Sequence, residues 1–155
     1  MKARHRLQFR PANTNDRDLL LEWANDPQVR QSSFRIEAVT NTEHDKWFQS
    51  RLNDANTRLW LFESGGVNCG MTRLERHGDD ATISYLLAAS FRGKGLAVKM
   101  LRMALNEIEK IWPSINVVAW SKPENHASIR SLESVGFQKM ETQLDQLCFT
   151  FKVSP

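Results

Sequence analysis

Hydrophobic and polar positions alternate along much of the chain, and this pattern predicts seven β-strands. Residues 58–63 and 67–76 flank the turn sequence Ser64-Gly65-Gly66, which is typical of a hairpin. A second turn sequence, Gly78-Asp79-Asp80, extends this hairpin into a three-stranded meander. The predicted strands are 7–10, 58–63, 67–76, 81–88, 115–120, 137–140 and 144–153.

Apolar residues at helical spacing predict two helices in the first third of the chain. The first carries Leu19, Leu20 and Trp23 and ends at residues 25–27, Asn-Asp-Pro, because proline interrupts helical hydrogen bonding. The second opens at residues 40–43, Thr-Asn-Thr-Glu, which have the spacing of a capping box. Residues 31–39 have no clear period between them and are predicted to form a loop.

Two further helices are predicted in the second half. The longer one follows Gly95, carries apolar residues at spacings of three and four, and ends at Pro113. The other begins at the N-cap candidate Asn125 and ends at Gly136, the usual residue type just beyond a helix.

The order of these elements is strand, two helices, meander, helix, strand, helix and hairpin. This order indicates an α+β fold, in which a mixed sheet is covered by helices. The chain has 155 residues, of which 41% are hydrophobic and 25% charged. Those values suit a single domain over residues 1–155 that needs no metal or disulfide to hold its core.

Charge and cysteine content narrow the classes of protein. The net charge of +3 comes from scattered basic residues, so a phosphorylated small molecule explains it as well as nucleic acid does. No apolar run approaches the length of a membrane span, and no apolar segment follows the basic N-terminus as in a secretory signal. We therefore expect a cytoplasmic protein with no membrane or nucleic-acid partner. Cys69 and Cys148 lack CxxC spacing and are expected to be structural thiols.

A glycine-rich turn at residues 92–97, Arg-Gly-Lys-Gly-Leu-Ala, joins a predicted strand to the longest helix. Such a turn exposes consecutive backbone N–H groups beside the positive end of the helix dipole, and it is typical of a phosphate or pyrophosphate site. Gly93 and Gly95 permit close approach of a ligand, and Arg92 and Lys94 supply charge. The alternative is a strand-to-helix turn that requires glycine for its conformation alone.

A second segment with candidate chemistry runs from Asn125 to Phe137. Asn125 and Ser128 lie three residues apart on the first turn of the predicted helix, so both can face a ligand. In the alternative, Asn125 caps the helix and Ser128 reaches back to it.

The two segments together resemble the GNAT acetyltransferase superfamily. Its pyrophosphate motif matches Arg92, Gly95 and Ala97, and its later motif matches Asn125 and Ser128 followed by Gly-Phe at 136–137. The resemblance covers nearly the whole chain and implies an N-acetyltransferase that uses acetyl-CoA as donor. It implies a central sheet with a splayed strand pair and about four flanking helices.

The same resemblance implies positions for the donor. The cofactor contacts would be the backbone of Tyr85, Leu86 and Leu87, the turn from Arg92 through Gly93, Lys94, Gly95 and Leu96 to Ala97, and the side chains of Asn125 and Ser128. The thioester would lie near Ala119, Trp120 and Ser121.

Two departures from the family affect catalysis. Many members have a tyrosine seven residues after the motif asparagine as the general acid, and here Leu132 takes its place. Many also carry a glutamate where this chain has Thr82. Tyr85, the only tyrosine, is a catalytic candidate, and water or another side chain could also protonate the thiolate. Candidate bases are His44, which is favoured because histidine titrates near neutral pH, followed by Glu22 and Asp26, or a chain of water molecules.

Segments 22–30 and 42–48 resemble the branch that acetylates nucleotide-linked amino-deoxysugars, as in pseudaminic-acid biosynthesis. The predicted acceptor contacts are Trp23, Asp26, Arg30, Arg35, Trp47 and Trp120, with both arginines on a diphosphate. Two alternatives remain open: an acceptor that is a protein N-terminus or polyamine, favoured by acidic residues such as Glu22 and Glu43, and a non-catalytic CoA-binding domain. A homodimer is compatible with the family resemblance.

Overall fold

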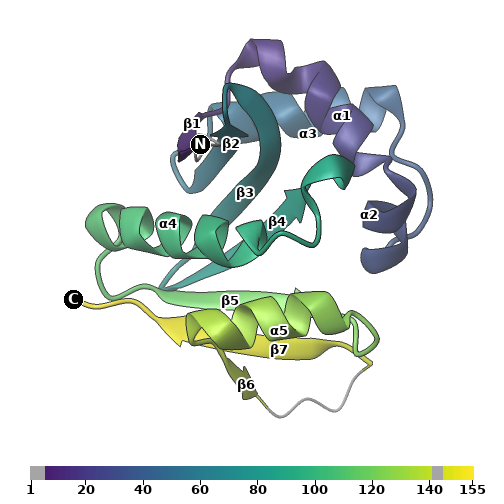
Figure 1. The fold of residues 1–155 in the computed structure, drawn as a ribbon. Helices are drawn as coiled ribbons and strands as arrows, with labels where there is room; N and C mark the ends of the chain where they lie inside the picture. Colours follow the sequence, from purple (N-terminus) through teal and green to yellow (C-terminus); the bar gives the residue numbers. More distant parts are fainter. Residues whose placement is uncertain (1–5, 141–144) are drawn as a thin grey trace, which may run out of the picture.

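The computed structural model describes residues 6–140 and 145–155. Its strands form one seven-stranded sheet in the order β1-β2-β3-β4-β5-β7-β6 (Figure 1). Every neighbouring pair is antiparallel except β4 and β5, which run parallel. The strands are β1 (Leu7–Pro11), β2 (Thr57–Ser64), β3 (Val67–His77), β4 (Asp80–Leu87), β5 (Asn116–Ser121), β6 (Gln138–Met140) and β7 (Leu147–Lys152).

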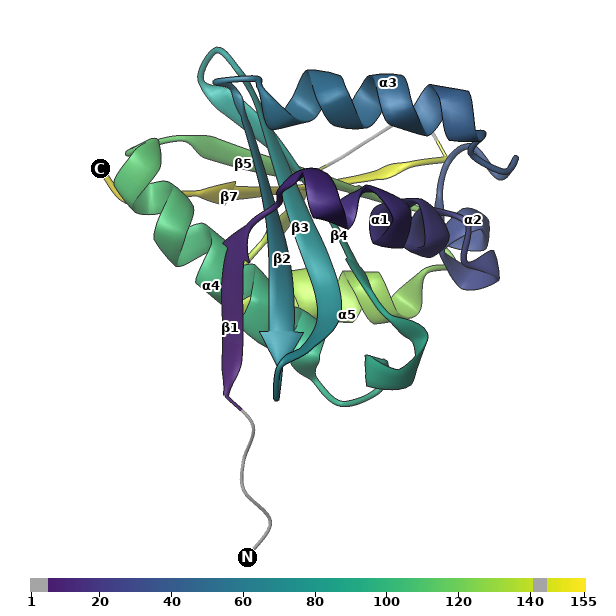
Figure 2. The same cartoon turned by 90° about the horizontal axis from the view of Figure 1, so that it is seen from above.

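Helices cover both faces of this sheet, so the predicted α+β class is confirmed (Figure 2). The α-helices are α1 (Arg17–Ala24), α2 (Pro27–Ser32), α3 (Asn41–Leu52), α4 (Leu96–Ile111) and α5 (His126–Val135). Two short 3₁₀ turns, η1 (Thr14–Asp16) and η2 (Ala89–Phe91), precede α1 and follow β4. None of the helices in the described part of the chain has the length and apolar character to cross a membrane.

The long helix α4 covers one face of the sheet. Its helical spacing aligns five fully buried side chains on one side: Met100, Leu101, Ala104, Leu105 and Ile108. They form one core with residues of β2 to β5 and β7. A second core lies on the opposite face, where Trp23 of α1 and Phe48 of α3 pack against Leu59, Leu61 and Met71. The two faces of β4 therefore look toward different sets of helices.

Local signals set most helix ends where the sequence predicts them. Thr40 accepts a hydrogen bond from the Glu43 amide and caps α3, and Asn125 accepts one from the Ser128 amide and caps α5. Gly136 ends α5 in the left-handed conformation, with φ of 115°.

The structure adds one helix to the about four that the sequence predicts, because Pro27–Ser32 forms α2 and only the rest of the connection to α3 is a loop. Asp26 caps α2 through the amides of Gln28 and Val29, and Pro27 occupies the first turn, where a missing N–H costs nothing. The last strand is shorter than predicted and begins at Leu147; residues 141–144 lie outside the described part.

The parallel pair β4 and β5 is joined only at its beginning. The register pairs Asp80 with Asn116, and it ends two residues later with Thr82 beside Val118. Beyond that point β4 continues for five residues, to Leu87, paired only with β3, and β5 continues to Ser121 paired only with β7. The two strands therefore splay apart toward their carboxyl ends, which is visible in Figure 1.

Candidate functional site

The glycine-rich turn follows the splayed end of β4 after the short turn η2. Gly93 and Gly95 have φ angles of 76° and 74°, a left-handed conformation that favours glycine. A Cβ atom at either position would meet no protein atom within 4 Å. The space beside both glycines is therefore free of protein, and side chains there would fill it.

The backbone of this turn offers hydrogen-bond donors. Within the described residues, no acceptor takes the N–H of Gly93, Lys94 or Gly95. Gly95 is the N-cap of the 16-residue helix α4, whose first amides have no partner within the helix. Free amides, the positive end of a helix dipole and Lys94 form a concave donor set for a pyrophosphate. The turn thus fits the donor group that the sequence predicted for it.

Tyr85 of β4 and Ser128 of α5 meet across the splay. Their hydroxyl oxygens lie 2.9 Å apart, in hydrogen-bonding distance. Burial raises the pKa of Tyr85 above its usual value, which the hydrogen bond to Ser128 offsets only in part, so the phenol stays protonated at neutral pH. The hydroxyl of Ser128 binds Tyr85, and its amide donates to the capping side chain of Asn125. The predicted contact of Ser128 with the cofactor stays a prediction.

Arg92, the first residue of the turn, is held by the start of α2. Its Nη2 donates to Oδ1 of Asp26 over 3.0 Å, and its Nη1 donates to Oε1 of Gln28 over 3.1 Å. Partial burial alone would raise the pKa of Asp26, but the guanidinium of Arg92 and two backbone amides lower it below its usual value. Asp26 is therefore a carboxylate at neutral pH, and it contacts the donor loop directly.

His44 does not lie where a general base must lie. Its side chain is 3% exposed, and its ring stacks on Phe48 at 5.9 Å between centroids. Nε2 lies 2.8 Å from the carbonyl oxygen of Arg17. Burial between two helices and this hydrogen bond give His44 a packing role, so His44 is withdrawn as the candidate base.

The two arginines predicted to hold a diphosphate are already engaged. The guanidinium of Arg30 donates to the carbonyl oxygens of Ala24, Arg35 and Glu37, which ties the α2–α3 connection together. Arg35 forms ion pairs with Glu43 at 3.0 Å and Glu37 at 3.8 Å. Arg30 is held by these carbonyl oxygens and is not free for a diphosphate, so its predicted role is corrected. Arg35 is 56% exposed in surface ion pairs that an anion can displace, so its diphosphate role stays a prediction.

The predicted aromatic contacts divide into core and surface residues. Trp23 is 8% exposed and belongs to the core of α1, so its predicted acceptor role is wrong. Trp47 packs under the guanidinium of Arg73, 5.1 Å from its ring centroid. Trp120, near the end of β5, is 43% exposed and opposite Cys148 of β7. Trp120 is the predicted aromatic that a ligand can reach.

Leu132, which replaces the usual tyrosine of the family, is 1% exposed in the core under α5. Glu22 is exposed on α1. Among the described residues no cluster of histidine, cysteine and carboxylate side chains could hold a metal ion. The sequence did not point to Gln28, which accepts from Arg92, or to Lys122, which donates to the carbonyl oxygen of Gln31. Polar contacts between residues so far apart in the chain leave no local signal.

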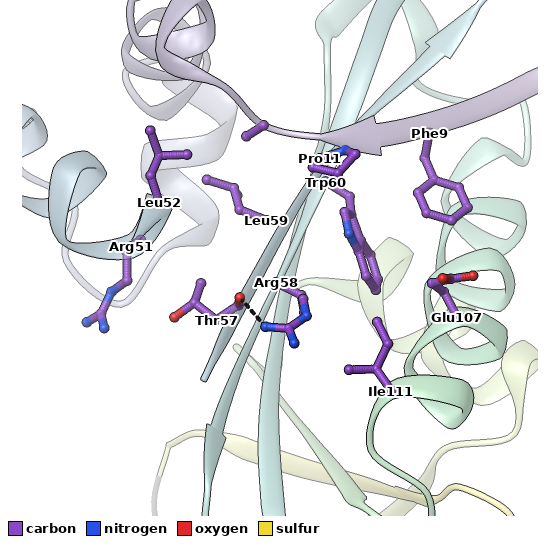
Figure 3. A pocket seen from close by; sticks show the side chains of 11 residues that line it. Phe9, Pro11, Arg51, Leu52, Thr57, Arg58, Leu59, Trp60, Glu107 and Ile111 are labelled. Atoms are coloured by element: carbon purple, nitrogen blue, oxygen red, sulfur yellow. Dashed lines mark hydrogen bonds between the residues drawn. The ribbon is translucent and has the colours of Figure 1, made fainter. Parts of the chain in front are cut away.

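One hollow of about 350 Å³ lies elsewhere, between the end of β1, the start of β2 and the carboxyl ends of α3 and α4 (Figure 3). Its lining includes Trp60, Arg58 and Ile111. Thr57 also lines the hollow, and it pairs with Glu75 of β3. Glu75 in turn pairs with Thr82 of β4, where β4 is still joined to β5. The hollow is therefore at the opposite end of the sheet from the glycine-rich turn, and it does not belong to the donor site.

A splayed parallel pair followed by an amide-lined turn at a helix start is the arrangement of an acyl-CoA-dependent transferase. Comparison with known proteins agrees, because the model of the GNAT acetyltransferase domain matches residues 6–138. The chain belongs to this family of acyltransferases, which take their acyl group from acetyl-CoA.

One relative and two solved structures are similar to this chain in sequence or in fold. The chain is 27% identical over 146 residues to the uncharacterized N-acetyltransferase p20 of Bacillus licheniformis, covering 86% of this chain and 80% of the relative. The spermidine N-acetyltransferase of Vibrio cholerae, solved with CoA and spermine, has a TM-score of 0.83 at 17% identity, with 95% of each chain covered. RimL, a ribosomal L7/L12 alpha-N-protein acetyltransferase solved with coenzyme A, has a TM-score of 0.81 at 16% identity, covering 95% of this chain and 94% of RimL. At these identities, the two structures support the fold alone.

Proposed function

We propose that the chain transfers the acetyl group of acetyl-CoA directly to the primary amine of a small cationic acceptor. The amine nitrogen attacks the thioester carbonyl carbon; the C–N bond forms, the C–S bond breaks, and the CoA thiolate leaves. The acceptor nitrogen, an ammonium group at neutral pH, loses one proton to solvent before attack and a second one after the C–N bond has formed, and the leaving thiolate gains one proton, so one proton is released overall. The free amides beside Gly93 and Gly95 are the observation that carries the donor half of this proposal.

Charge distribution supports a cationic acceptor. Residues 13–56 contain eight acidic and five basic residues, a net charge of −3 in a chain whose net charge is +3. They include η1 and the helices α1 to α3, and we call the face that they form the acceptor side. Glu22 is exposed and Asp26 lies beside the donor turn. The basic residues that would favour an anionic sugar nucleotide, Arg30 and Arg35, are occupied by carbonyl oxygens and carboxylates. An acceptor with several positive charges is attracted by this face, and a diphosphate is repelled by it.

Tyr85 is the proposed general acid. It is a protonated hydroxyl on the splayed part of β4, in hydrogen-bonding distance of Ser128. A thiolate with an ordinary pKa of about 8.5 needs only a weak acid to leave. No separate base is required where the acceptor loses its proton to water, which agrees with the buried position of His44.

The spermidine enzyme of Vibrio cholerae and the RimL enzyme act, by their names, on a polyamine and on a protein N-terminus. Both acceptors are amines that carry positive charge at neutral pH. The proposal predicts this class for the present chain, and it makes a nucleotide-linked amino sugar the weaker acceptor.

Acetyl-CoA consumption with three acceptors tests the proposal: spermidine, a basic peptide with a free N-terminus, and a uridine diphosphate amino-deoxysugar. We expect kcat/KM for the better cationic acceptor to exceed that for the sugar nucleotide at least tenfold, about 1.4 kcal/mol. Preference for the sugar nucleotide would contradict the acceptor assignment. CoA binding without turnover of any acceptor would contradict catalysis itself.

A matched pair of variants separates charge from fold. Glu22→Gln removes an exposed carboxylate from α1, and Glu109→Gln removes a partly exposed carboxylate from α4. We expect the first to raise KM for spermidine several-fold, about 1 kcal/mol, with little change in kcat, and the second to leave both constants unchanged.

A further inference from the structure

The short helix α2 connects the two sides of the strand splay. At its beginning, Asp26 and Gln28 bind Arg92, which follows β4. At its end, the carbonyl oxygen of Gln31 accepts a hydrogen bond of 2.8 Å from Nζ of Lys122, which follows β5. These contacts join residues 66 and 91 positions apart in the chain. Figure 1 shows α2 beside the ends of both strands.

None of the residues of α2 is buried, and hydrogen bonds attach its two ends to the segments after β4 and β5. The connection around it, residues 25–39, is internally tied. Asn25 exchanges two hydrogen bonds with the backbone of Val39, of 2.7 and 2.9 Å, and Arg30 binds three carbonyl oxygens. The connection therefore keeps its own shape when its outer contacts change.

Arg92 is the outer contact that the donor itself can change. Arg92 is the first residue of the turn whose amides fit a pyrophosphate, and its guanidinium forms an ion pair with the Asp26 carboxylate. The side chains of both residues are partly exposed, 23% for Arg92 and 24% for Asp26, so an anion from solvent can reach the pair. A pyrophosphate carries more negative charge than one carboxylate, and guanidinium groups bind phosphates with charge-assisted hydrogen bonds. Two anionic partners then compete for one cation.

We propose that the pyrophosphate of acetyl-CoA draws Arg92 away from Asp26, and that the released carboxylate binds the ammonium group of the acceptor. This inference rests on the proposed function, since it assigns Asp26 as a positioning residue of the same site. Donor binding thus prepares the acceptor site, and the two ligands bind with positive coupling. By linkage, the acceptor then tightens donor binding by the same factor.

Asp26→Asn tests the exchange with little change to the fold. Asparagine is as good an N-cap as aspartate, so the contacts to the amides of Gln28 and Val29 persist. The variant loses the charge that holds Arg92. Glu37→Gln is the matched control, because it removes one negative charge from the same connection without touching Arg92.

Calorimetry with CoA, which cannot donate an acetyl group, measures the coupling without turnover. In the wild type we expect spermidine to bind at least about fivefold more tightly to the CoA complex than to the free protein, within the usual range of coupling energies. We expect CoA alone to bind Asp26→Asn at least about threefold more tightly than it binds the wild type. In this variant CoA should no longer change the affinity for spermidine. Glu37→Gln should behave as the wild type in both measurements.

The opposite result for CoA overturns the proposal: weaker binding to Asp26→Asn would mean that Asp26 holds Arg92 in place for the pyrophosphate. Coupling that survives in Asp26→Asn would also overturn it. If the wild type bound CoA but not spermidine, the proposed acceptor would fail, while the CoA affinity of Asp26→Asn would still decide the exchange. A merely structural role of Asp26 predicts a lower melting temperature and no tightening of CoA.

Discussion

Gly95→Asp is the most direct perturbation of the donor turn. The residue has φ of 74° and ψ of 11°, so any side chain there is placed in the left-handed region at a cost of roughly 1 kcal/mol. A Cβ at this position meets no protein atom within 4 Å, so no steric clash adds to that cost. The variant should fold, with a melting temperature lower by about 2–4 °C.

The effect on the donor should be larger than the effect on stability. A carboxylate about 5 Å from a phosphate charge, at an effective dielectric constant of about 20, is repelled by roughly 3 kcal/mol. Screening by salt reduces this value, because the turn is exposed to solvent. We therefore expect the dissociation constant of acetyl-CoA to rise at least tenfold, about 1.4 kcal/mol.

Titration calorimetry with CoA measures this change, and Gly78→Asp is the matched control. Gly78 has φ of 64°, an equally open surrounding, and a place in the turn between β3 and β4 at the far end of the sheet. Both variants should lose similar stability, and only Gly95→Asp should lose affinity. Wild-type CoA affinity in Gly95→Asp would refute the placement of the pyrophosphate on this turn.

Three further predictions concern mechanism and stability. Tyr85→Phe should lower kcat about 100-fold at a nearly unchanged KM for acetyl-CoA, and an unchanged kcat would exclude Tyr85 as the acid. Because the pKa of this phenol is raised, the wild-type rate should show no loss from its ionisation below about pH 10. Replacing Cys69 and Cys148 by alanine should leave turnover nearly intact, since burial raises the pKa of both thiols, and mass spectrometry of the wild type during turnover should find no acetylated cysteine. Arg10 binds Asp16 through two hydrogen bonds of 2.8 Å and lowers the pKa of this carboxyl below its usual 3.8. The pair therefore stabilises the folded protein above about pH 3.8, and this contribution is lost as the pH falls toward the pKa of Asp16 in the folded state. Asp16→Asn should cost about 2 kcal/mol at pH 7 by denaturant unfolding and should flatten this acid dependence; an unchanged acid dependence would contradict the pairing.

The sequence alone determined the α+β class, the order of the strands and of all helices but one, and the conformation of the glycine-rich turn. These features depend on interactions within a few residues. The period of α4 places its apolar side chains on one face, Thr40 and Asn125 cap helices three residues ahead of their partners, and Gly95 adopts a conformation that few other residues accept. The one missed helix, α2, has six residues, too few to show a helical period, although Asp26-Pro27 is a helix-start signal.

Only the tertiary structure decided what the polar side chains do. In the sequence, His44 is as compatible with a general base as with a packed ring. Helix α1 decides between these roles, because the carbonyl oxygen of Arg17 lies 2.8 Å from Nε2 of His44. Arg30 has the charge to bind a diphosphate, but the folded connection surrounds it with carbonyl oxygens. The contacts between Tyr85 and Ser128, and between Asp26 and Arg92, join residues 43 and 66 positions apart. A hydrogen bond acts over about 3 Å, and which groups come within that distance is set by the packing of the sheet and its helices rather than by neighbouring residues.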